Sequence, residues 1–405
     1  MTEQRIGPVT AAQVPEFERL VAQSFGEVMS DETIAAISGV KELDRTFAVF
    51  EGGRIIATAE TISFTAGMPG RPPAPCAGLT SVSVHPARRR RGLLAQLMRR
   101  QLEDAHERGE PFASLYASES GIYGRFGYGP AAPSVDLAGA VPAARLAQPV
   151  ALPDGFDLVP VAQGLDLLPS IYDRVQASTP AMMSRPASFW EVILTHDPPE
   201  TREGHTPYQL GVLPDRGYVL YRIKEGWRDH LPDGTLRVVE LMATDDESYA
   251  ALWGYCLSLD LMARLRAPLR PPDDPVRLSL TDGHRLRAVV GDPLWLRLLS
   301  LPEAIAARTY SAPADVVVAV RDATCSWNQG TWRLELGADG GTCSPTTASA
   351  DLELDVAELS ACFLGGVRLT QLVRSRRVTE HRAGAAWLLD RALAADPLPW
   401  NPRIF

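Results

Sequence analysis

The chain has 405 residues, of which 45% are hydrophobic and 22% are charged, and its formal net charge is −9. This length allows about two to four domains of about 100–200 residues each, and the composition excludes a disordered, collagenous or coiled-coil protein. Almost all positive charge is arginine, because Lys41 and Lys224 are the only lysines. The negative balance argues against nucleic acid as a partner and favours cationic partners.

The sequence contains no stretch near 18 uninterrupted apolar residues and no charged amino-terminal region followed by an apolar run. We therefore expect a cytoplasmic protein with no membrane partner and no signal peptide. The cysteines are odd in number, scattered along the chain and without metal-ligand spacing. They are Cys76, Cys256, Cys325, Cys343 and Cys362. We expect them to be reduced packing residues, and we expect no metal site.

The first 130 residues alternate segments typical of strands and helices. Two β-rich runs, Thr46–Phe50 and Ile55–Phe64, are joined by the segment 51–54, whose two glycines tolerate positive φ and predict a hairpin. The proline- and glycine-rich stretch 67–75 predicts a loop. The alternating run Leu79–Val84 predicts the next strand.

A helix is predicted after this strand, because apolar residues recur at the spacing of one buried helical face. These residues are Leu93, Leu94, Leu97, Met98, Leu102 and Ala105. Gly109 and Pro111 are expected to end the helix. The run Phe112–Tyr116 predicts a further strand, and the glycines of 117–130 predict a sharply turning segment.

The proline- and alanine-rich stretch 140–153 is interpreted as a linker. The region after it repeats the order of the first region, with a hairpin of Tyr208–Leu213 and Tyr218–Ile223, a strand at Leu236–Met242 and a helix over 246–262. Carboxylates, instead of arginines, precede this second helix. We therefore expect only the first region to hold an anion at its helix.

A third region begins near residue 312, where β-branched and alternating runs predict strands and apolar periodicity predicts helices. The expected strands are Val316–Val320, Thr331–Leu336 and Asp351–Asp355, and the expected helices are Val356–Phe363 and Ala383–Ala394. The tail Pro397–Phe405 contains three prolines and is apolar. We expect it to pack through Trp400, Ile404 and Phe405, whereas a frayed end is the alternative.

Four consecutive arginines followed by Gly92 separate the strand at 79–84 from the helix that follows. The first N–H groups of a helix have no internal partner, and the helix dipole attracts negative charge, so this junction predicts an anion site. Gly92 lets a ligand approach the backbone. A solvated charged surface is the alternative interpretation of the same arginines.

This junction, read together with the Ser-Val-Ser-Val-His-Pro that precedes it, resembles the pyrophosphate-binding segment of the GCN5-related N-acetyltransferases (GNAT). The signature of that family is Gln/Arg-x-x-Gly-x-Gly/Ala, and its defined positions are here Arg89, Gly92 and Leu94. Leu94 departs from the usual small residue. The block 117–130, the Trp-Leu-Arg-Leu-Leu that begins at Trp295 and the terminal phenylalanine resemble the Eis (enhanced intracellular survival) acetyltransferases within this family.

The resemblance implies an α+β protein with tandem GNAT-like acetyltransferase domains followed by a domain similar to sterol carrier protein. We place these domains at residues 1–140, 141–300 and 301–405, the second being a degenerate copy of the first. The resemblance also implies a homo-oligomer, namely a hexamer, and acetyl-CoA as acyl donor. The donor-binding positions that match the family are Val82, Val84, Arg89, Arg90, Gly92, Leu93, Leu94 and Ser118.

The resemblance also implies two catalytic groups. Tyr123 matches the general acid of the family, and a reference pKa of about 10 keeps a tyrosine protonated at neutral pH. Packing in a glycine-rich turn is its alternative role. The terminal carboxylate of the family folds back into the site, so the carboxylate of Phe405 is expected to act as the base. Glu119 is interpreted either as a substrate carboxylate or as a turn residue.

The sequence therefore predicts an N-acetyltransferase that moves the acetyl group of acetyl-CoA to a primary amine of aminoglycoside, polyamine or lysine type by direct attack. One alternative is an acyltransferase of similar architecture that uses longer chains, as N-myristoyltransferases do. The other is a non-catalytic lipid-binding or scaffold protein.

Overall fold

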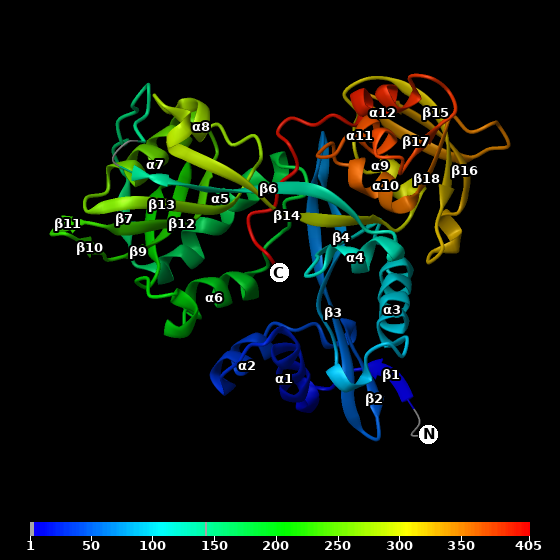
Figure 1. Cartoon of the computed structure of the whole chain (residues 1–405), viewed down its shortest axis with the longest axis horizontal. Coiled ribbons are helices and arrows are strands. Elements are labelled where there is room, and N and C mark those ends of the chain that lie inside the picture. Colours follow the sequence, from blue (N-terminus) through cyan, green and yellow to red (C-terminus); the bar gives the residue numbers. More distant parts are fainter. Residues whose placement is uncertain (1–3, 142–143) are drawn as a thin grey trace. The chain divides into compact units, whose positions relative to one another are not determined.

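The computed structural model describes residues 4–141 and 144–405, and these divide into two compact units. The first unit contains the residues up to Ala132, then Pro293–Pro399 and Ile404–Phe405. The second contains Pro133–Asp292 and Trp400–Arg403. Figure 1 shows the strands and helices of both units. The carboxyl-terminal tail thus contributes residues to each of them.

The amino-terminal part of the first unit is built on a sheet in which β1, β2, β3 and β4 are antiparallel neighbours and β5 runs parallel to β4. The strands are β1 (Gln4–Pro8), β2 (Thr46–Glu51), β3 (Arg54–Met68), β4 (Arg71–Val84) and β5 (Phe112–Tyr116). The end of β14 (Leu286–Leu298) pairs antiparallel with β5. The predicted hairpin at 51–54 is confirmed, and Gly52 and Gly53 have φ of 59° and 82°.

Successive side chains of β2 point to opposite faces of this sheet, as the period of two in a strand requires, and both faces are buried. Phe47 and Val49 pack in one cluster with the apolar face of α3, whereas Ala48 and Phe50 pack in another cluster with α1. The helices are α1 (Val14–Phe25), α2 (Asp31–Ser38) and α3 (Leu93–Glu107). In Figure 1, α1 and α3 lie on opposite sides of the long strands.

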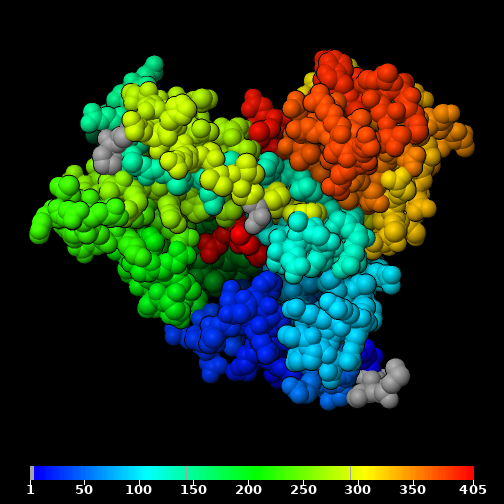
Figure 2. Space-filling model, viewed as in Figure 1, coloured from blue at the N-terminus to red at the C-terminus, as the bar shows by residue number. Residues whose placement is uncertain are grey.

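The predicted stripe of α3 is confirmed for five of its residues, because Leu93, Leu97, Met98, Leu102 and Ala105 are buried, whereas Leu94 is half-buried. The opposite face of α3 is exposed and is visible in light blue in Figure 2. The turning segment after β5 forms the short α4 (Ser120–Tyr123) and a single 3-10 turn at Gly124–Phe126.

The predicted loop over residues 67–75 is wrong. The chain turns tightly at Pro69 and Gly70, and β4 already begins at Arg71. Proline lacks the N–H that a central strand needs, and so it is tolerated where one side of a strand is unpaired. β5 pairs with β4 only at Cys76–Gly78, so the prolines at 72, 73 and 75 lie on a stretch of β4 whose only described strand neighbour is β3.

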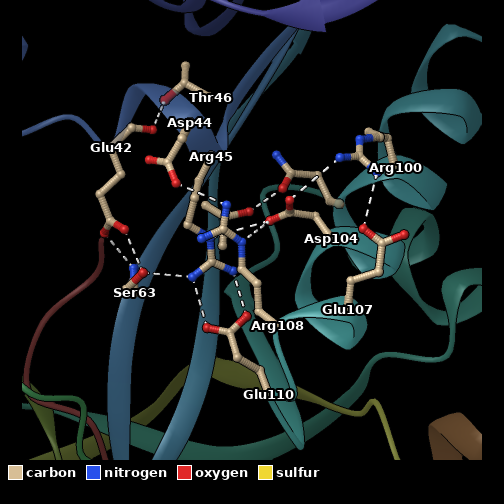
Figure 3. Close-up of polar contacts among 12 residues, drawn as sticks. Glu42, Asp44, Arg45, Thr46, Ser63, Arg100, Asp104, Glu107, Arg108 and Glu110 are labelled. Carbon is tan, nitrogen blue, oxygen red and sulfur yellow. Dashed lines mark hydrogen bonds and ion pairs between the residues drawn. The ribbon is translucent and has the colours of Figure 1, made fainter.

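A buried arginine connects the sheet of the first unit to the end of α3 (Figure 3). Arg45, 1% exposed, donates two hydrogen bonds to the Glu110 carboxylate at 2.8 and 2.5 Å and one to Ser63 Oγ at 2.7 Å. Its Nε lies 3.6 Å from Asp104, which also accepts a 2.9 Å hydrogen bond from Arg108. This network fixes α3, at whose opposite end the predicted anion site lies.

The second unit is built on a sheet with the order β6-β13-β12-β9-β8-β7. Its strands are β6 (Gly129–Ala140), β7 (Asp157–Val159), β8 (Gln209–Leu213), β9 (Gly217–Lys224), β12 (Gly234–Ala243) and β13 (Met262–Arg270). Its helices are α5 (Gly164–Ser178), α6 (Ala187–Thr195), α7 (Asp246–Ser258) and α8 (Val276–Ser279), and Trp227–Arg228 (β10) pairs with Leu231–Pro232 (β11). The predicted hairpin of β8 and β9 is confirmed.

The helix predicted over 246–262 is too long at its carboxyl end, because α7 ends at Ser258 and β13 begins at Met262. The apolar run continues past this point, but Leu261 adopts a φ of 65°, which a helix does not allow. The amino end agrees with the prediction. The Asp245 side chain caps the helix by accepting a 2.8 Å hydrogen bond from Ser248 N.

The carboxyl-terminal part of the first unit has a sheet of its own, with the order β17-β16-β15-β18-β19. Its strands are β15 (Ala314–Arg321), β16 (Gly330–Gly337), β17 (Gly340–Pro345), β18 (Leu352–Asp355) and β19 (Thr379–Glu380), and its helices are α9 (Leu301–Ala306), α10 (Val356–Cys362), α11 (Leu369–Arg374) and α12 (Ala385–Leu393). All three predicted strands and both predicted helices are present. No sequence pattern had indicated β17, which has three glycines or prolines, the two-residue strand β19 or the six-residue helices α9 and α11.

The five cysteines are free thiols, and four of them are buried while Cys343 is half-buried. Burial raises the pKa of the Cys76 thiol to about 12 and that of Cys325 to about 11. Neutral thiols in apolar surroundings are the expected state of packing residues. No helix within the described residues has both the length and the apolar character needed to cross a membrane.

Candidate active site

The connection between β4 and α3 has the backbone geometry of an anion-binding loop. A 3-10 turn at Pro86–Arg88 leads to Arg90, whose φ is 63°, and to Gly92, whose φ is 79°. Gly92 is the N-cap residue of α3, and a Cβ placed on it would meet no atom within 4 Å. The glycine is needed here for its positive φ, and the space beside it is open to a ligand.

The arginines of this loop differ in their partners. Arg88 Nε donates a 2.6 Å hydrogen bond to Glu51, so its charge is already neutralised. Arg89 and Arg90 are exposed and border the same cavity, whereas Arg91 does not line it. Three arginines of this loop, Arg88, Arg89 and Arg90, thus line the cavity together with the first turn of α3, and Arg88 is already paired with Glu51.

A cavity of about 960 Å³ lies beside this loop, entirely within the first unit. It is bordered by the end of β4, the start of α3, the turn around α4 and a loop of the carboxyl-terminal sheet. Nine of the ten site residues predicted from the sequence line it, namely Val82, Val84, Arg89, Arg90, Gly92, Leu93, Leu94, Ser118 and Tyr123. Glu119, the first flanking residue of α4, lines it as well.

The strand that borders the cavity is interrupted by a β-bulge. Two residues of β4, Ser81 and Val82, face the single residue Ala59 of β3, and Ser81 adopts a φ of 52°. The described pairing of β4 with β5 ends at Gly78 and Ser114. A bulge leaves a residue out of the ladder and redirects its backbone groups. The end of β4 can therefore offer main-chain N–H groups to a ligand lying between the two strands.

Tyr123 is a buried wall of this cavity. Its side chain is 6% exposed, and its ring lies 6.3 Å from that of Tyr128 in an edge-to-face arrangement. Burial raises the pKa of the Tyr123 hydroxyl above its ordinary value of 10.0, and the Glu119 carboxylate raises it further. The hydroxyl is therefore protonated throughout the neutral range and is available as a proton donor.

Phe405, the tenth predicted residue, lies apart from this cavity. Its ring packs 4.9 Å from the ring of Phe64 on β3 and 5.6 Å from the ring of Tyr116 at the end of β5. It also lies close to Gly78, so it packs where β4 and β5 separate. Of the other tail residues expected to pack, Trp400 is 5% exposed, whereas Ile404 is 55% exposed, and that part of the prediction is wrong.

The segment just before Phe405 is fixed by hydrogen bonds within the second unit. Trp400 N donates to Pro180 O at 2.9 Å, and the indole Nε1 of Trp400 donates to Leu269 O at 2.5 Å. The Asn401 side chain, 4% exposed, accepts a 3.0 Å hydrogen bond from Met183 N. The tail is therefore a built element of the fold and not a frayed end.

Several residues around the cavity were not found from the sequence. Arg99 lies two helical turns after Gly92 on α3, a spacing that the helical period gives, and Arg125 follows Tyr123 by two positions. Ala323 and Thr324 come from the distant carboxyl-terminal sheet, and no local pattern indicates them.

The loop that carries Thr324 is itself fixed by buried groups. The Asp322 carboxylate accepts hydrogen bonds from Thr324 N at 3.2 Å and Cys325 N at 2.9 Å, and it pairs with the buried Arg297 at 2.5 Å. These bonds hold the loop that forms this side of the cavity wall in place.

The cavity suits a ligand that carries several phosphates. Five arginines line it, Arg88, Arg89, Arg90, Arg99 and Arg125, and Glu119 is the one carboxylate among its lining residues. Guanidinium groups and free helix N–H groups are the donors that phosphates prefer. The volume is also within the range of about 300–1,000 Å³ that holds small molecules and cofactors. Acetyl-CoA, with its pyrophosphate and its 3′-phosphate, fits this set of donors.

Comparison with protein families assigns all three parts of the chain. Residues 5–131 and residues 181–298 each match a model of the acetyltransferase (GNAT) domain, and residues 301–402 match a model of the sterol carrier protein domain. These matches confirm the α+β fold class, with two GNAT domains and a sterol-carrier-like domain.

Individual proteins are similar over almost the whole chain. An uncharacterized N-acetyltransferase of Streptomyces avermitilis is 37% identical over 96% of both chains. The N-acetyltransferase Eis of Mycobacterium bovis is 30% identical over 93% of both chains. The crystal structure of Eis1 from Mycobacterium abscessus superposes with a TM-score of 0.88, 30% identity and full coverage of both chains. The chain belongs to the Eis family of GNAT acetyltransferases and is an acetyl-CoA-dependent N-acetyltransferase.

Proposed function

We propose that this enzyme transfers the acetyl group of acetyl-CoA directly to a primary amine of a cationic acceptor, with Tyr123 as general acid and the terminal carboxylate of Phe405 as base. The observation that carries the proposal is the position of Tyr123. This buried hydroxyl shares one cavity with the arginine loop, the start of α3 and the bulged end of β4.

The leaving group determines what Tyr123 does. The amine nitrogen attacks the thioester carbonyl carbon, the C–S bond breaks, and the electron pair goes to the CoA sulfur. A thiol of the cysteine type has a pKa of about 8.5, so a proton donor at the sulfur helps it leave. The Tyr123 hydroxyl gives its proton to the sulfur, and its raised pKa keeps that proton available at neutral pH.

The acceptor determines what the Phe405 carboxylate does. A primary amine with a pKa of about 10.4 is neutral in about one molecule in 2,500 at pH 7, a cost of about 4.6 kcal/mol. A carboxylate removes the proton directly or through one water. The packing of the Phe405 ring against Tyr116 and beside Gly78 supports this role, because β4 and β5 separate at this point.

The thioester oxygen gains negative charge during the attack and needs a donor. The bulge at Ser81 and Val82 supports a main-chain N–H of the Val82–Val84 segment in this role. The donor groups of this site are those that the sequence motif selects, Arg89, Arg90 and Gly92 with Leu93 and Leu94. They bind the pyrophosphate and hold the thioester beside Tyr123.

The acceptor that we propose is an aminoglycoside, a polyamine or a lysine-like side chain. The net charge of −9 favours cationic molecules near the protein, and Glu119 adds a carboxylate to the cavity wall. We further propose a cytoplasmic homo-hexamer, for which the support is the family resemblance. Light scattering coupled to size-exclusion chromatography measures the number of subunits.

The function is tested by measuring CoA release with a panel of aminoglycosides, polyamines and lysine peptides. Acetyl-CoA is compared with longer acyl-CoAs in the same assay, because an acyltransferase for long chains would prefer the latter. Turnover with acetyl-CoA and at least one amine class is expected. No CoA release with any amine, together with a lipid that copurifies in stoichiometric amount, would instead support a lipid-binding protein.

A further inference from the structure

A buried group of charged residues lies directly behind the bulge of β4. Lys41 Nζ is 2.6 Å from Glu18 Oε1, and it forms an ion pair with Glu60, to whose carboxylate it donates a hydrogen bond. The side chains of Lys41, Glu18 and Glu60 are 1%, 3% and 8% exposed. None of the three lines the cavity described above. The group is therefore closed to ligands, and any role in the reaction is indirect.

Glu60 connects this group to the bulge through one hydrogen bond. Ser81 Oγ donates to Glu60 Oε2 at 3.0 Å. Ser81 has a φ of 52°, a backbone conformation that residues other than glycine and asparagine rarely adopt. A strained residue persists only where its surroundings hold it in place, and here the surroundings include a buried carboxylate.

A second contact holds the same residue from the other side. Thr58 Oγ1 donates to the Ser81 carbonyl oxygen at 2.8 Å, and the Thr58 and Ser83 hydroxyls lie 2.6 Å apart. Both Thr58 and Ser83 are buried. The side chain and the carbonyl of Ser81 are thus both hydrogen-bonded. The amide nitrogen of Val82 is joined to that carbonyl carbon by the planar peptide bond, so these bonds also orient the Val82 N–H.

Stability alone is a weak reason for this arrangement. Burying an ion pair costs desolvation energy that its attraction often does no more than offset, and apolar residues of similar size are frequently as stable. Lys41 Nζ also lies 4.8 Å from the centroid of the Phe17 ring, and Phe17 belongs to the apolar cluster of α1. What an apolar replacement would not supply is the acceptor for Ser81.

We propose that Glu60 is a positioning residue for acetyl transfer, which through Ser81 holds the β4 bulge so that a main-chain N–H of the Val82 segment points at the thioester oxygen. Lys41 and Glu18 hold the Glu60 carboxylate in place. This inference rests on the proposed function, since it assigns a support to the donor that stabilises the developing oxyanion.

The inference predicts how substitutions of Ser81 and Glu60 differ. Ser81→Ala and Glu60→Ala remove the hydrogen bond and are expected to lower kcat about ten- to a hundredfold with the KM for acetyl-CoA nearly unchanged. Glu60→Gln keeps an acceptor for Ser81 and is expected to retain most of kcat. The kcat of Ser81→Gly is expected to be higher than that of Ser81→Ala, because glycine adopts the positive φ without strain.

Thr342→Ala is the matched control for Ser81→Ala. Thr342 lies on the strand β17, and its hydroxyl also donates to a glutamate, Glu335, at 3.3 Å, but it is not at the bulge and does not line the cavity. Its substitution is expected to leave kcat within about twofold of the wild type. Circular dichroism and the thermal unfolding midpoint show whether each variant is folded.

A spectroscopic measurement tests the hydrogen bond to the carbonyl directly. Isotope-edited infrared spectra of bound acetyl-CoA labelled with ¹³C at the carbonyl are expected to show the band at lower wavenumber in the wild type than in Ser81→Ala. A folded Ser81→Ala with wild-type kcat and an unshifted band would overturn this inference and leave the proposed function intact. Equal losses in Glu60→Gln and Glu60→Ala would also overturn it, because the charge and not the acceptor would then matter. A wild type without turnover on any amine would overturn the proposed function itself.

Discussion

The rings of Phe405 and Phe64 lie 4.9 Å apart, centroid to centroid, and both are adjacent to Gly78 of β4. A Cβ on Gly78 would lie 2.5 Å from the Phe64 ring and 3.1 Å from the Phe405 ring. The Phe405 ring can therefore pack in this position only because Gly78 of β4 has no side chain. Any group added there must displace one of the two rings.

Gly78→Ala is accordingly expected to lower kcat about ten- to a hundredfold by moving the terminal carboxylate, while the affinity for acetyl-CoA changes little. Steady-state kinetics with both substrates varied measures the two effects. Gly337→Ala is the control, because a Cβ at that position meets no atom within 4 Å. Wild-type kcat in a folded Gly78→Ala would argue against a catalytic role for the tail.

Tyr123→Phe is expected to lower kcat by about a hundredfold or more, since it removes the hydroxyl that we propose as proton donor to the sulfur. Tyr128→Phe is the matched control, because Tyr128 is equally buried in the same cluster but does not line the cavity. A similar loss in both variants would show that packing, not proton donation, is the role of Tyr123.

The pH dependence follows from the same residue. The proposed general acid must be protonated to act, and burial raises the pKa of Tyr123 above its ordinary value of 10.0. The rate constant kcat/KM is therefore expected to rise with pH as the amine loses its proton, and to show no descending limb caused by Tyr123 below about pH 10. A descending limb near neutral pH that disappears in Tyr123→Phe would contradict this assignment.

Arg90→Ala is expected to raise the KM for acetyl-CoA about tenfold, the usual cost of one charge-assisted hydrogen bond to phosphate. The effect should be smaller at high salt, because exposed charges are screened. Arg91→Ala, one position further and outside the cavity lining, is expected to change this KM less than about twofold. Equal effects of the two substitutions would indicate a general effect of charge and no specific site.

Arg45→Met is expected to destabilise the first unit by about 3–5 kcal/mol, because it leaves Glu110 and Asp104 without their buried cation. The thermal unfolding midpoint measures this loss. The side chain of Arg108 is 39% exposed, so Arg108→Met is expected to cost about 1 kcal/mol or less. A midpoint equal to that of the wild type in Arg45→Met would show that the network of Figure 3 does not hold α3.

Local patterns predicted those parts of the fold and site that local physics determines. The β2–β3 hairpin and α3 were found because glycine pairs and helical periodicity are read within a few residues. The loop that contains the four arginines and Gly92 was found for the same reason, since its arginines, its glycine and the start of α3 are consecutive. The prolines at 72, 73 and 75 led to the wrong prediction of a loop, because a strand tolerates proline where one of its sides has no neighbouring strand.

The other features depend on contacts between distant residues. Thr324 joins the cavity from a loop that is some 200 residues away in sequence from Tyr123, and nothing in its neighbourhood indicates this. The bulge at Ser81 depends on Thr58 and Glu60 of another strand. The end of α7 depends on the positive φ of Leu261, which the apolar run conceals.

The most direct test of the central claim is to add one glycine after Phe405 and to measure CoA release with acetyl-CoA and the best amine of the panel. The extension moves the carboxylate by up to about 3.8 Å and leaves every side chain in place. A fall in kcat of about a hundredfold, with an unchanged dissociation constant for acetyl-CoA, is the predicted result for the loss of a positioned base. Turnover equal to that of the wild type would contradict the role of the terminal carboxylate and require another group to accept the proton.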